Sequence, residues 1–439
     1  MESKKPVKTL ELWKQAKKII PGGSQLLSKR AEMFLPDQWP AYYKRAKGVE
    51  VTDLDDNIYI DMSIMGVGAC ILGYADDDVN RAVKAVIDNG SMSTLNAPEE
   101  VELAKLLLNL HPWAGMVRYT RSGGEALSVA VRIARAFRQK EKIAFCGYHG
   151  WHDWYLAGNL ASERHLDGHL LPGLEPRGVP RGLLDTAIPF KYNEIEELEQ
   201  IVKQHDIGVI IVESIRHEEP KNNFLQKIRI IANKINAVLI FDEVSSGFRL
   251  CVGGAYTKYG VLPDIVVYAK GISNGFPMGV VLGKTSVMDA AQTTFISSTY
   301  WTESIGPTAA LATIKKMQKL DVPKHLDYMG KQIWQGWKKL AGKHGLKIRI
   351  LGPAPLVTFL FEYDNAQEIR TLFTQEMLKR GFLASASVYV SYAHKDEHVN
   401  QYLDAVDEVF GVIKKAFNTN SVNSLLEGPV AHKEFKRLT

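Results

Sequence analysis

Residues 237–271 read AVLIFDEVSSGFRLCVGGAYTKYGVLPDIVVYAKG, and they place two charged side chains just after two short, mainly apolar segments. Asp242 follows Ala237–Phe241, and Lys270 lies just beyond Asp264–Tyr268. Short runs of Val, Ile and Leu are typical of strands that are buried on both faces of a parallel sheet. Ligands bind such sheets outside the carboxyl ends of the strands. The stretch therefore predicts a carboxylate and an amine at the ligand-binding edge of one sheet.

The same alternation of short apolar strand and helix extends from about residue 75 to residue 300. Further strands are expected at Met116–Thr120, Lys142–Cys146 and Ile207–Val212, and helices at Glu99–Leu110, Asn193–Gln204 and Phe224–Lys234. Another helix is indicated by apolar residues that recur with helical spacing, namely Leu127, Ala130, Val131, Ala134 and Phe137. Strands that alternate with helices predict an α/β fold with a large, mostly parallel sheet covered by helices.

After Ser304 the pattern changes to longer helices with few strands. Helices are expected at Ile305–Lys319, Gln332–His344, Ala366–Arg380 and Glu397–Phe417, and strands at Lys347–Leu351 and Val357–Phe361. These segments predict a second, smaller α+β unit. Near the N-terminus, Val49–Asp61 alternates apolar residues around a turn, which is typical of a β-hairpin. The last 20 residues are polar and loop-like, and a loosely held tail is expected there.

Composition excludes several classes of protein. The chain has 439 residues, of which 46% are hydrophobic and 23% charged, so it is neither disordered nor fibrous. Its 54 basic and 49 acidic residues leave a net charge of +5, which is no argument for nucleic acid as a partner. Cys70, Cys146 and Cys251 show no C-x-x-C spacing, so neither a disulfide framework nor a metal site is expected. No apolar run has the length of a membrane span, and a cytoplasmic protein without a membrane partner is expected.

Three glycine-bearing segments resemble phosphate-binding loops, and two of them do not match the spacing that such loops require. Gly66–Gly68 is followed by Ile71 where a dinucleotide-binding fingerprint needs glycine. Gly279–Thr285 has three residues between its glycines where a P-loop has four, so ATP hydrolysis is not expected. Ser122–Gly124 follows a strand and opens a helix, where free N–H groups and the helix dipole favour an anion. This segment fits an anion site, and equally a tight turn in which Ser122 only caps the helix.

An anion cradle, a carboxylate and an amine on one sheet edge are the groups that pyridoxal 5′-phosphate (PLP) requires. A lysine forms a Schiff base with the aldehyde of PLP, a carboxylate keeps its pyridine nitrogen protonated, and a helix N-terminus holds its phosphate. Lys270, Asp242 and Ser122–Gly124 would supply these groups. A strand-end aspartate alone is usually a helix cap and a strand-end lysine alone is usually solvated. The combination therefore indicates PLP, with Lys270 as general base once substrate amine has displaced it.

With these motifs in place, the chain resembles the class III, fold type I PLP-dependent aminotransferases, and within them the glutamate-1-semialdehyde 2,1-aminomutase branch. The resemblance runs from about Pro21 to Phe410. It implies a large PLP-binding domain at residues 66–305 and a small domain built from residues 1–65 and 306–439. It also implies individual roles: Lys270 carries the cofactor, Asp242 binds the ring nitrogen, Tyr148 stacks on the ring, Val244 lies against the ring face, Glu213 lies near the ring hydroxyl, and Ser122, Gly123 and Gly124 bind the phosphate.

The chain departs from the pattern of the family at two places near the phosphate. Gly124 stands where the family has Ser or Thr, so backbone N–H groups replace a hydroxyl donor. Ser297–Glu303 replaces the usual Gly-Thr-Leu-Ser-Gly-Asn-Pro run, and it introduces two bulky aromatic residues. Thr299 is the residue of this segment that we expect to reach the phosphate of the neighbouring subunit. The resemblance therefore implies a homodimer with shared active sites.

The sequence determines the substrate less closely than the cofactor. Residues 381–394 contain no arginine where the ornithine and GABA branches hold a substrate carboxylate, which argues against those substrates. Arg30 and Arg216 are candidates for binding an anionic group of the substrate. Arg30 is as readily a solvated loop residue, and Arg216 a partner of Glu218 or Glu219. An aromatic wall for a sugar-like substrate is the other open interpretation, formed by Trp39, Tyr42, Tyr43 and Trp301.

Three functions stay open at this point. The first is an aminotransferase that moves an amino group from a donor such as glutamate to an aldehyde or ketone, both of them small molecules. The second is an intramolecular aminomutase of the glutamate-1-semialdehyde type, or another PLP-dependent reaction on the same fold. The third is a binding or regulatory protein without chemistry, against which the intact set of Lys270, Asp242 and Tyr148 counts.

Overall fold

The computed structural model of the protein describes residues 7–434 apart from residues 163, 168, 170, 171, 216 and 420. Its internal packing divides the chain into two compact units. One unit joins both ends of the chain, Met1–Asp76 with Lys324–Thr439, and the other is the continuous stretch Asp77–Pro323.

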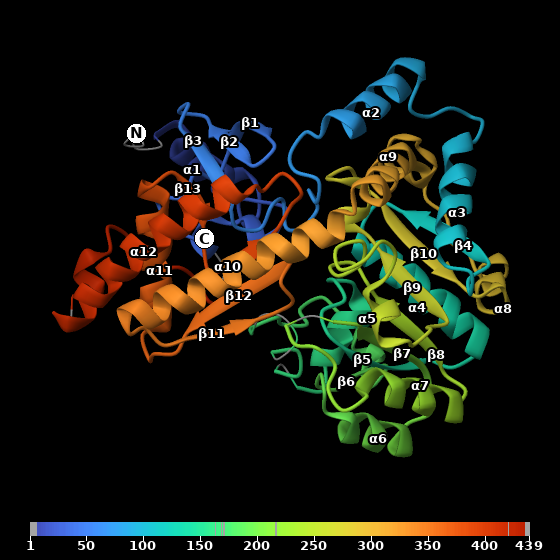
Figure 1. Cartoon of the computed structure of the whole chain (residues 1–439). Coiled ribbons are helices and arrows are strands. Elements are labelled where there is room, and N and C mark those ends of the chain that lie inside the picture. The colour runs from blue at the N-terminus through green and yellow to red at the C-terminus, as the bar shows by residue number, and fades with distance from the viewer. Residues whose placement is uncertain are drawn as a thin grey trace. The chain divides into compact units, whose positions relative to one another are not determined.

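A seven-stranded sheet lies at the centre of the unit Asp77–Pro323, in the order β4-β10-β9-β8-β7-β5-β6 (Figure 1). The strands are β4 (Met116–Thr120), β5 (Lys142–Cys146), β6 (Ala187–Pro189), β7 (Ile207–Glu213), β8 (Val238–Asp242), β9 (Ile265–Tyr268) and β10 (Gly279–Gly283). β10 runs antiparallel to both of its neighbours, β4 and β9, and the other described pairs of the sheet are parallel. Every residue of β7, β8, β9 and β10 is buried, as the continuous apolar runs predict for strands covered on both faces. The predicted α/β fold with a mostly parallel sheet is confirmed.

Helices cover this sheet. They are α2 (Asp77–Asn89), α3 (Pro98–Leu110), α4 (Gly123–Arg138), α5 (Asp153–Leu156), α6 (Ile195–Gln204), α7 (Phe224–Lys234), α8 (Thr285–Met288) and α9 (Ile305–Leu320). Helix α4 lies along β7, β9 and β10, and it buries Leu127, Ala130, Val131 and Ala134 of the predicted apolar face. Phe137, the fifth predicted member, lies in the last turn and is exposed.

The sequence analysis did not predict strand β10, because this glycine-bearing segment resembles a shortened P-loop. Its glycines permit close approach to the neighbouring strands. A Cβ at Gly279 would lie 2.2 Å from Oγ1 of Thr120, and a Cβ at Gly283 would lie 2.7 Å from the carbonyl oxygen of Asp264. The segment is therefore a buried strand between β4 and β9.

The other unit contains two small sheets with helices, which agrees with the predicted α+β pattern. Its strands are β1 (Tyr43–Lys47), β2 (Glu50–Asp53), β3 (Ile58–Met62), β11 (Ile348–Leu351), β12 (Leu356–Phe361), β13 (Phe382–Ala384) and β14 (Ser387–Tyr389), and its helices include α1 (Val7–Ile19), α10 (Val322–His344), α11 (Ala366–Lys379) and α12 (Asp396–Asn418). Strands β2 and β3 form the predicted hairpin, and β13 pairs in parallel with β3. This pairing joins the two ends of the chain in one sheet.

The C-terminal segment after α12 corrects the expectation of a loosely held tail. Gln375 on α11 donates to the carbonyl of Leu425 and accepts from the backbone N–H of Glu427. Thr371, one turn earlier, accepts from the backbone N–H of Ala431, whose side chain is buried. The prediction from polar composition was wrong because backbone groups of the segment form hydrogen bonds with side chains of α11. No sequence pattern reveals these hydrogen bonds.

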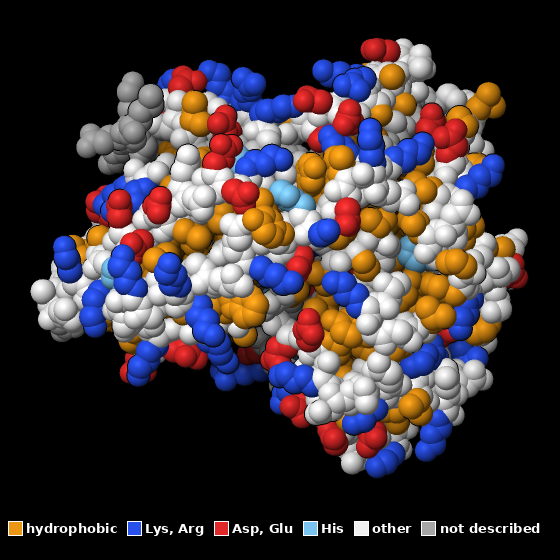
Figure 2. All heavy atoms as spheres, viewed as in Figure 1, with side chains coloured by type: hydrophobic (Ala, Val, Ile, Leu, Met, Phe, Trp, Pro, Cys, Tyr) orange, Lys and Arg blue, Asp and Glu red, His pale blue; other side chains and the backbone are white. Residues whose placement is uncertain are grey.

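On the face that Figure 2 shows, basic and acidic side chains are interspersed, and neither sign forms a continuous patch. No helix among the described residues is long and apolar enough to cross a membrane.

Candidate active site

Four neighbouring parallel strands end beside residues that the sequence singled out. Asp242, the last residue of β8, pairs in register with Glu213, the last residue of β7. Tyr148 follows the end of β5, and Lys270 follows the end of β9. Because β9, β8, β7 and β5 are adjacent and parallel, all four side chains come from one edge of the sheet.

Asp242 is buried, with 3% of its surface exposed, and its carboxylate is held on both oxygens. Oδ1 accepts from the backbone N–H of Val244 at 2.9 Å, and Oδ2 lies 2.7 Å from Nδ1 of His149. Nε2 of His149 lies 3.1 Å from the carbonyl oxygen of Cys146, which can only accept, so Nε2 carries a proton. This arrangement fixes the carboxylate in an orientation that local sequence does not specify.

Lys270 has a backbone φ of 47°, a left-handed conformation that is uncommon for residues other than glycine. Its Nζ donates to Oγ of Ser245 at 2.7 Å. The loop that carries Ser245 is anchored by Glu243, which is fully buried. Glu243 accepts from Oγ of Ser214 at 2.5 Å, from Oγ of Ser246 at 2.6 Å and from the backbone N–H of Tyr256 at 2.9 Å. Burial raises the pKa of Glu243.

The segment Ser122–Gly124 opens helix α4, and Oγ of Ser122 caps the helix by accepting from the backbone N–H of Glu125 at 3.3 Å. The first N–H groups of a helix have no partner within the helix, so they are available to an anion. A Cβ at Gly123 would lie 2.9 Å from Cγ1 of Val244 and 3.5 Å from Cβ of Ala269. The start of α4 therefore lies against the residues that follow Asp242 and precede Lys270.

Tyr148 is positioned by its backbone. Its N–H donates to Oε2 of Glu213 at 3.0 Å, and its ring makes an edge contact with Tyr155 at 5.8 Å between centroids. The preceding residue is Gly147, with φ of 118°, and a Cβ there would lie within 2.4 Å of Oε2 of Glu213. Glycine is therefore required for Glu213 to reach this loop.

Thr299 begins an exposed turn, Thr299–Thr302. Within the described part of one chain, no hydrogen bond joins its side chain to the other predicted site residues. The turn is held by Arg121, which donates to the carbonyls of Trp301 and Glu303 and forms an ion pair with the Glu303 carboxylate at 2.6 Å. Glu303 in turn accepts from the first backbone N–H groups of α9.

Neither of the two arginines proposed for the substrate belongs to the described part of the unit that carries this site. Arg30 belongs to the other compact unit, where its guanidinium lies beside Gly22. Arg216 lies outside the described residues.

The residues present fit PLP. A buried carboxylate with oriented oxygens suits a pyridine N–H, a lysine amine stands at the next strand end, and the first N–H groups of a glycine-bearing helix N-terminus suit a phosphate. Among the described residues no cluster of His, Cys, Asp or Glu could hold a metal ion.

Comparison with known proteins agrees with this geometry. The family model described as aminotransferase class-III matches residues 35–410. The chain belongs to the class III aminotransferases. This class III aminotransferase is 30% identical over 429 residues to a 3-aminobutyryl-CoA aminotransferase of Cloacimonas acidaminovorans, covering 94% of this chain and 99% of the relative. It is 32% identical over 430 residues to a glutamate-1-semialdehyde 2,1-aminomutase of Ignicoccus hospitalis, covering 92% and 99%.

Solved structures share the fold of this class III aminotransferase. The FumI protein of Sphingopyxis sp. MTA144, solved in its PLP internal aldimine form, superimposes with a TM-score of 0.84 at 23% identity, covering 94% of this chain and 97% of that one. A glutamate-1-semialdehyde aminomutase of Pseudomonas aeruginosa gives 0.79 at 18% identity, covering 92% and 94%. The family expected from the sequence is confirmed, and with it PLP as the cofactor and the enzymatic nature of the protein.

Sequence reasoning missed several residues that organise the site of this aminotransferase. His149 lies within the quoted Tyr148–Gly150 motif, and Glu243 directly follows Asp242, yet neither was assigned a role. Ser245 and Arg121 were not considered at all. The only signal in the sequence was that these residues lie next to predicted site residues. Their hydrogen-bond partners are distant in the sequence or are brought close by a turn, so no local pattern reveals them.

Proposed function

We propose that this protein is an intermolecular aminotransferase, which moves an amino group from a donor such as glutamate to an aldehyde or ketone. The observation that carries the proposal is the placement of the Lys270 amine and the buried Asp242 carboxylate at neighbouring strand ends, beside the N-terminus of α4. When bound, PLP withdraws electrons from the amino-bearing carbon of the substrate, which makes a proton on that carbon removable.

The side chains of the site have distinct tasks in this proposal. Lys270 would hold PLP through its Nζ, and the free amine would carry a proton at Nζ between substrate atoms. Asp242, held by His149 and by the N–H of Val244, keeps the pyridine nitrogen protonated. Tyr148 and Val244 hold the two faces of the ring, and Glu213 lies toward the ring hydroxyl. Ser122, Gly123 and Gly124 bind the phosphate through the start of α4.

The proposal includes a homodimer with shared sites. Thr299 lies on an exposed turn that Arg121 and Glu303 fix in place. An exposed but ordered threonine is suited to reach the phosphate of a second copy of the chain. On this proposal Arg30 and Arg216 stay candidates for holding an anionic group of the substrate.

An aminomutase is the second candidate, because the Ignicoccus hospitalis relative with 32% identity carries that name. A mutase completes its cycle with one compound, whereas a transferase needs an unlike donor and acceptor. Separate half-reactions with a panel of amines and carbonyl compounds, glutamate-1-semialdehyde included, distinguish the two. Turnover of one compound in the absence of any other donor or acceptor would overturn the intermolecular reaction.

The role of Lys270 is tested by reducing the PLP-loaded enzyme with borohydride and locating the modified residue by peptide mass spectrometry. We expect the modification on Lys270. The Lys270→Ala variant should lose turnover by a factor of about a thousand or more, since it lacks the amine that moves the proton. Lys258→Ala, which removes an exposed lysine of the same unit, serves as the matched control and should keep full activity. Modification at another lysine would refute the assignment.

A further inference from the structure

Arg121 belongs to the segment that opens the predicted phosphate site. It directly precedes Ser122, and its backbone N–H donates to Oε2 of Glu125, in the first turn of α4, at 3.0 Å. This contact uses only the backbone of Arg121. It therefore stays in place when the side chain at position 121 is changed.

The side chain of Arg121 extends to the turn Thr299–Thr302. Its Nη2 donates to the carbonyl oxygens of Trp301 at 2.9 Å and of Glu303 at 2.8 Å. Its Nε lies 2.6 Å from Oε1 of Glu303, whose carboxylate also accepts from the first backbone N–H groups of α9. Both side chains of the ion pair are largely buried. A planar guanidinium with these contacts fixes the turn in one orientation.

The turn has an inner and an outer side. Trp301 is half-buried and packs against the core of the unit, whereas Thr299, Tyr300 and Thr302 are exposed. Oγ1 of Thr302 donates to the carbonyl oxygen of Thr299 at 2.9 Å, which closes the turn. The turn therefore projects Thr299 from a base that Arg121 and Trp301 hold.

We propose that Arg121 is a positioning residue for PLP in the neighbouring subunit. This inference rests on the proposed function, since it needs a homodimer in which Thr299 reaches the phosphate bound by the partner. The guanidinium of Arg121 then orients a donor for the phosphate of the other site, while its backbone leads into the phosphate-binding start of α4 in its own chain. Each Arg121 thereby links the two cofactor sites of the dimer.

The first experiment compares binding of PLP with binding of pyridoxal, which lacks the phosphate, to apoenzyme variants, followed by absorbance and protein fluorescence. Arg121→Gln should raise the dissociation constant for PLP by about tenfold, the range for a lost hydrogen bond to a charged group, and leave that for pyridoxal unchanged. Arg121→Lys keeps the charge that balances Glu303 but lacks the planar fork, so it should give a smaller loss in the same direction. The lysine variant replaces Arg121→Gln throughout if the latter does not fold.

The second experiment separates an effect on the neighbouring subunit from an effect within one chain. The alternative is an effect within the chain, because Nη1 of Arg121 donates to the carbonyl oxygen of Thr120 at 3.0 Å. Hybrid dimers of one wild-type and one Arg121→Gln chain, with different affinity tags, are incubated with limiting PLP and reduced with borohydride. The chains are separated in denaturant, and the label on Lys270 of each is measured by mass spectrometry. We expect about three times or more as much label on the variant chain, whose site receives Thr299 from the wild-type chain.

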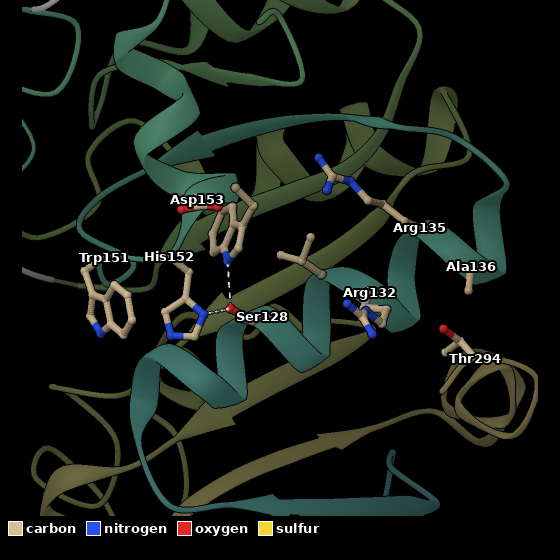
Figure 3. A pocket seen from close by; sticks show the side chains of 10 residues that line it. Ser128, Arg132, Arg135, Ala136, Trp151, His152, Asp153 and Thr294 are labelled. Atoms are coloured by element: carbon tan, nitrogen blue, oxygen red, sulfur yellow. Dashed lines mark hydrogen bonds between the residues drawn. The ribbon is translucent and has the colours of Figure 1, made fainter. Parts of the chain in front are cut away.

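Arg132→Gln is the matched control. Arg132 lies on α4 and lines the pocket shown in Figure 3, and its Nη1 donates to the carbonyl oxygen of Phe295, four residues before Thr299. The substitution removes an arginine contact to the same segment but leaves the contacts of the turn Thr299–Thr302 intact. Hybrid dimers with Arg132→Gln should therefore carry equal label on the two chains.

Unchanged PLP affinity in Arg121→Gln, equal losses for PLP and pyridoxal, or equal or greater label on the wild-type chain of the hybrid would each overturn the inference. Failure of the proposed function gives different results. In that case the wild type would carry no label on Lys270, or it would be a monomer in light scattering, whatever the residue at position 121.

Discussion

The amine of Lys270 lies 2.7 Å from the hydroxyl of Ser245, a residue three positions after Asp242. A hydroxyl can accept from an ammonium and donate to a neutral amine, so it can hold Lys270 in both protonation states. The buried carboxylate of Glu243 fixes the loop that presents this hydroxyl. Ser245 is therefore a positioning residue for the amine.

Ser245→Ala should lower kcat by about tenfold while KM for the amino donor changes little, because the free amine loses a fixed orientation. Stopped-flow measurement of the first half-reaction checks this expectation. Ser245→Thr keeps the hydroxyl and should stay close to the wild type. An unchanged kcat in the alanine variant would show that the contact has no part in turnover.

His149 and Asp242 form a buried pair, and we expect its removal to weaken both cofactor binding and catalysis. His149→Ala leaves one oxygen of a buried carboxylate without a partner, a change that costs about 1–3 kcal/mol or a factor of about 5 to 150. The measurement is the rate of PLP release together with kcat. Wild-type values for both would contradict the positioning of Asp242 by His149.

Arg121 and Glu303 form an ion pair whose side chains are only 11% and 16% exposed. Glu303→Gln removes the charge that balances a largely buried guanidinium, and it should destabilise the fold by about 2–4 kcal/mol. The exposed pair Lys331–Asp327 supplies the control, since Asp327→Asn should cost less than about 1 kcal/mol. Urea unfolding at neutral pH compares the two variants, and equal costs would contradict the prediction.

His394 makes stability depend on pH in a predictable direction. It is fully buried, accepts from the backbone N–H of Ser391 at Nδ1 and donates from Nε2 to the carbonyl of Asp61. Burial lowers the pKa of His394 to about 4, from 6.5. Between these values the unfolded chain binds a proton that the folded chain does not. Stability should therefore fall as pH falls from about 6.5 to about 4, by about 3 kcal/mol from this residue.

Unfolding free energies at pH 7 and pH 4 for the wild type and His394→Asn check this expectation. The variant should be less stable at pH 7, because it lacks the buried ring, but its stability should decline less with acid. A decline of the same size in both proteins would assign the acid sensitivity to other groups.

Removing the C-terminal segment should destabilise the unit that contains α11. A chain that ends at Thr419 loses the hydrogen bonds that Gln375 and Thr371 make to the backbone of Leu425, Glu427 and Ala431. At about 1 kcal/mol for each bond, the loss is about 3 kcal/mol. Thr371→Val removes one of these bonds and should cost about a third as much. A truncated chain with wild-type stability would restore the expectation of a loosely held tail.

The sequence by itself determined the mostly parallel sheet and the positions of Asp242 and Lys270 at its edge. Strands buried on both faces require unbroken apolar runs, and such runs are visible without any structure. A polar residue directly after such a run must lie at the strand end. The start of α4 was visible for the same reason, since helical spacing begins directly after Ser122–Gly124.

Only the tertiary structure decided which side chains meet at that edge. Strand β10 carries glycines that mimic a phosphate loop, and the three-residue strands β6, β13 and β14 are too short to show a period. The contacts of Asp242 with His149 and of Arg121 with Glu303 join segments that are separate in the chain. No periodicity encodes such contacts, because they depend on how loops from different strands turn toward one another after the sheet has formed.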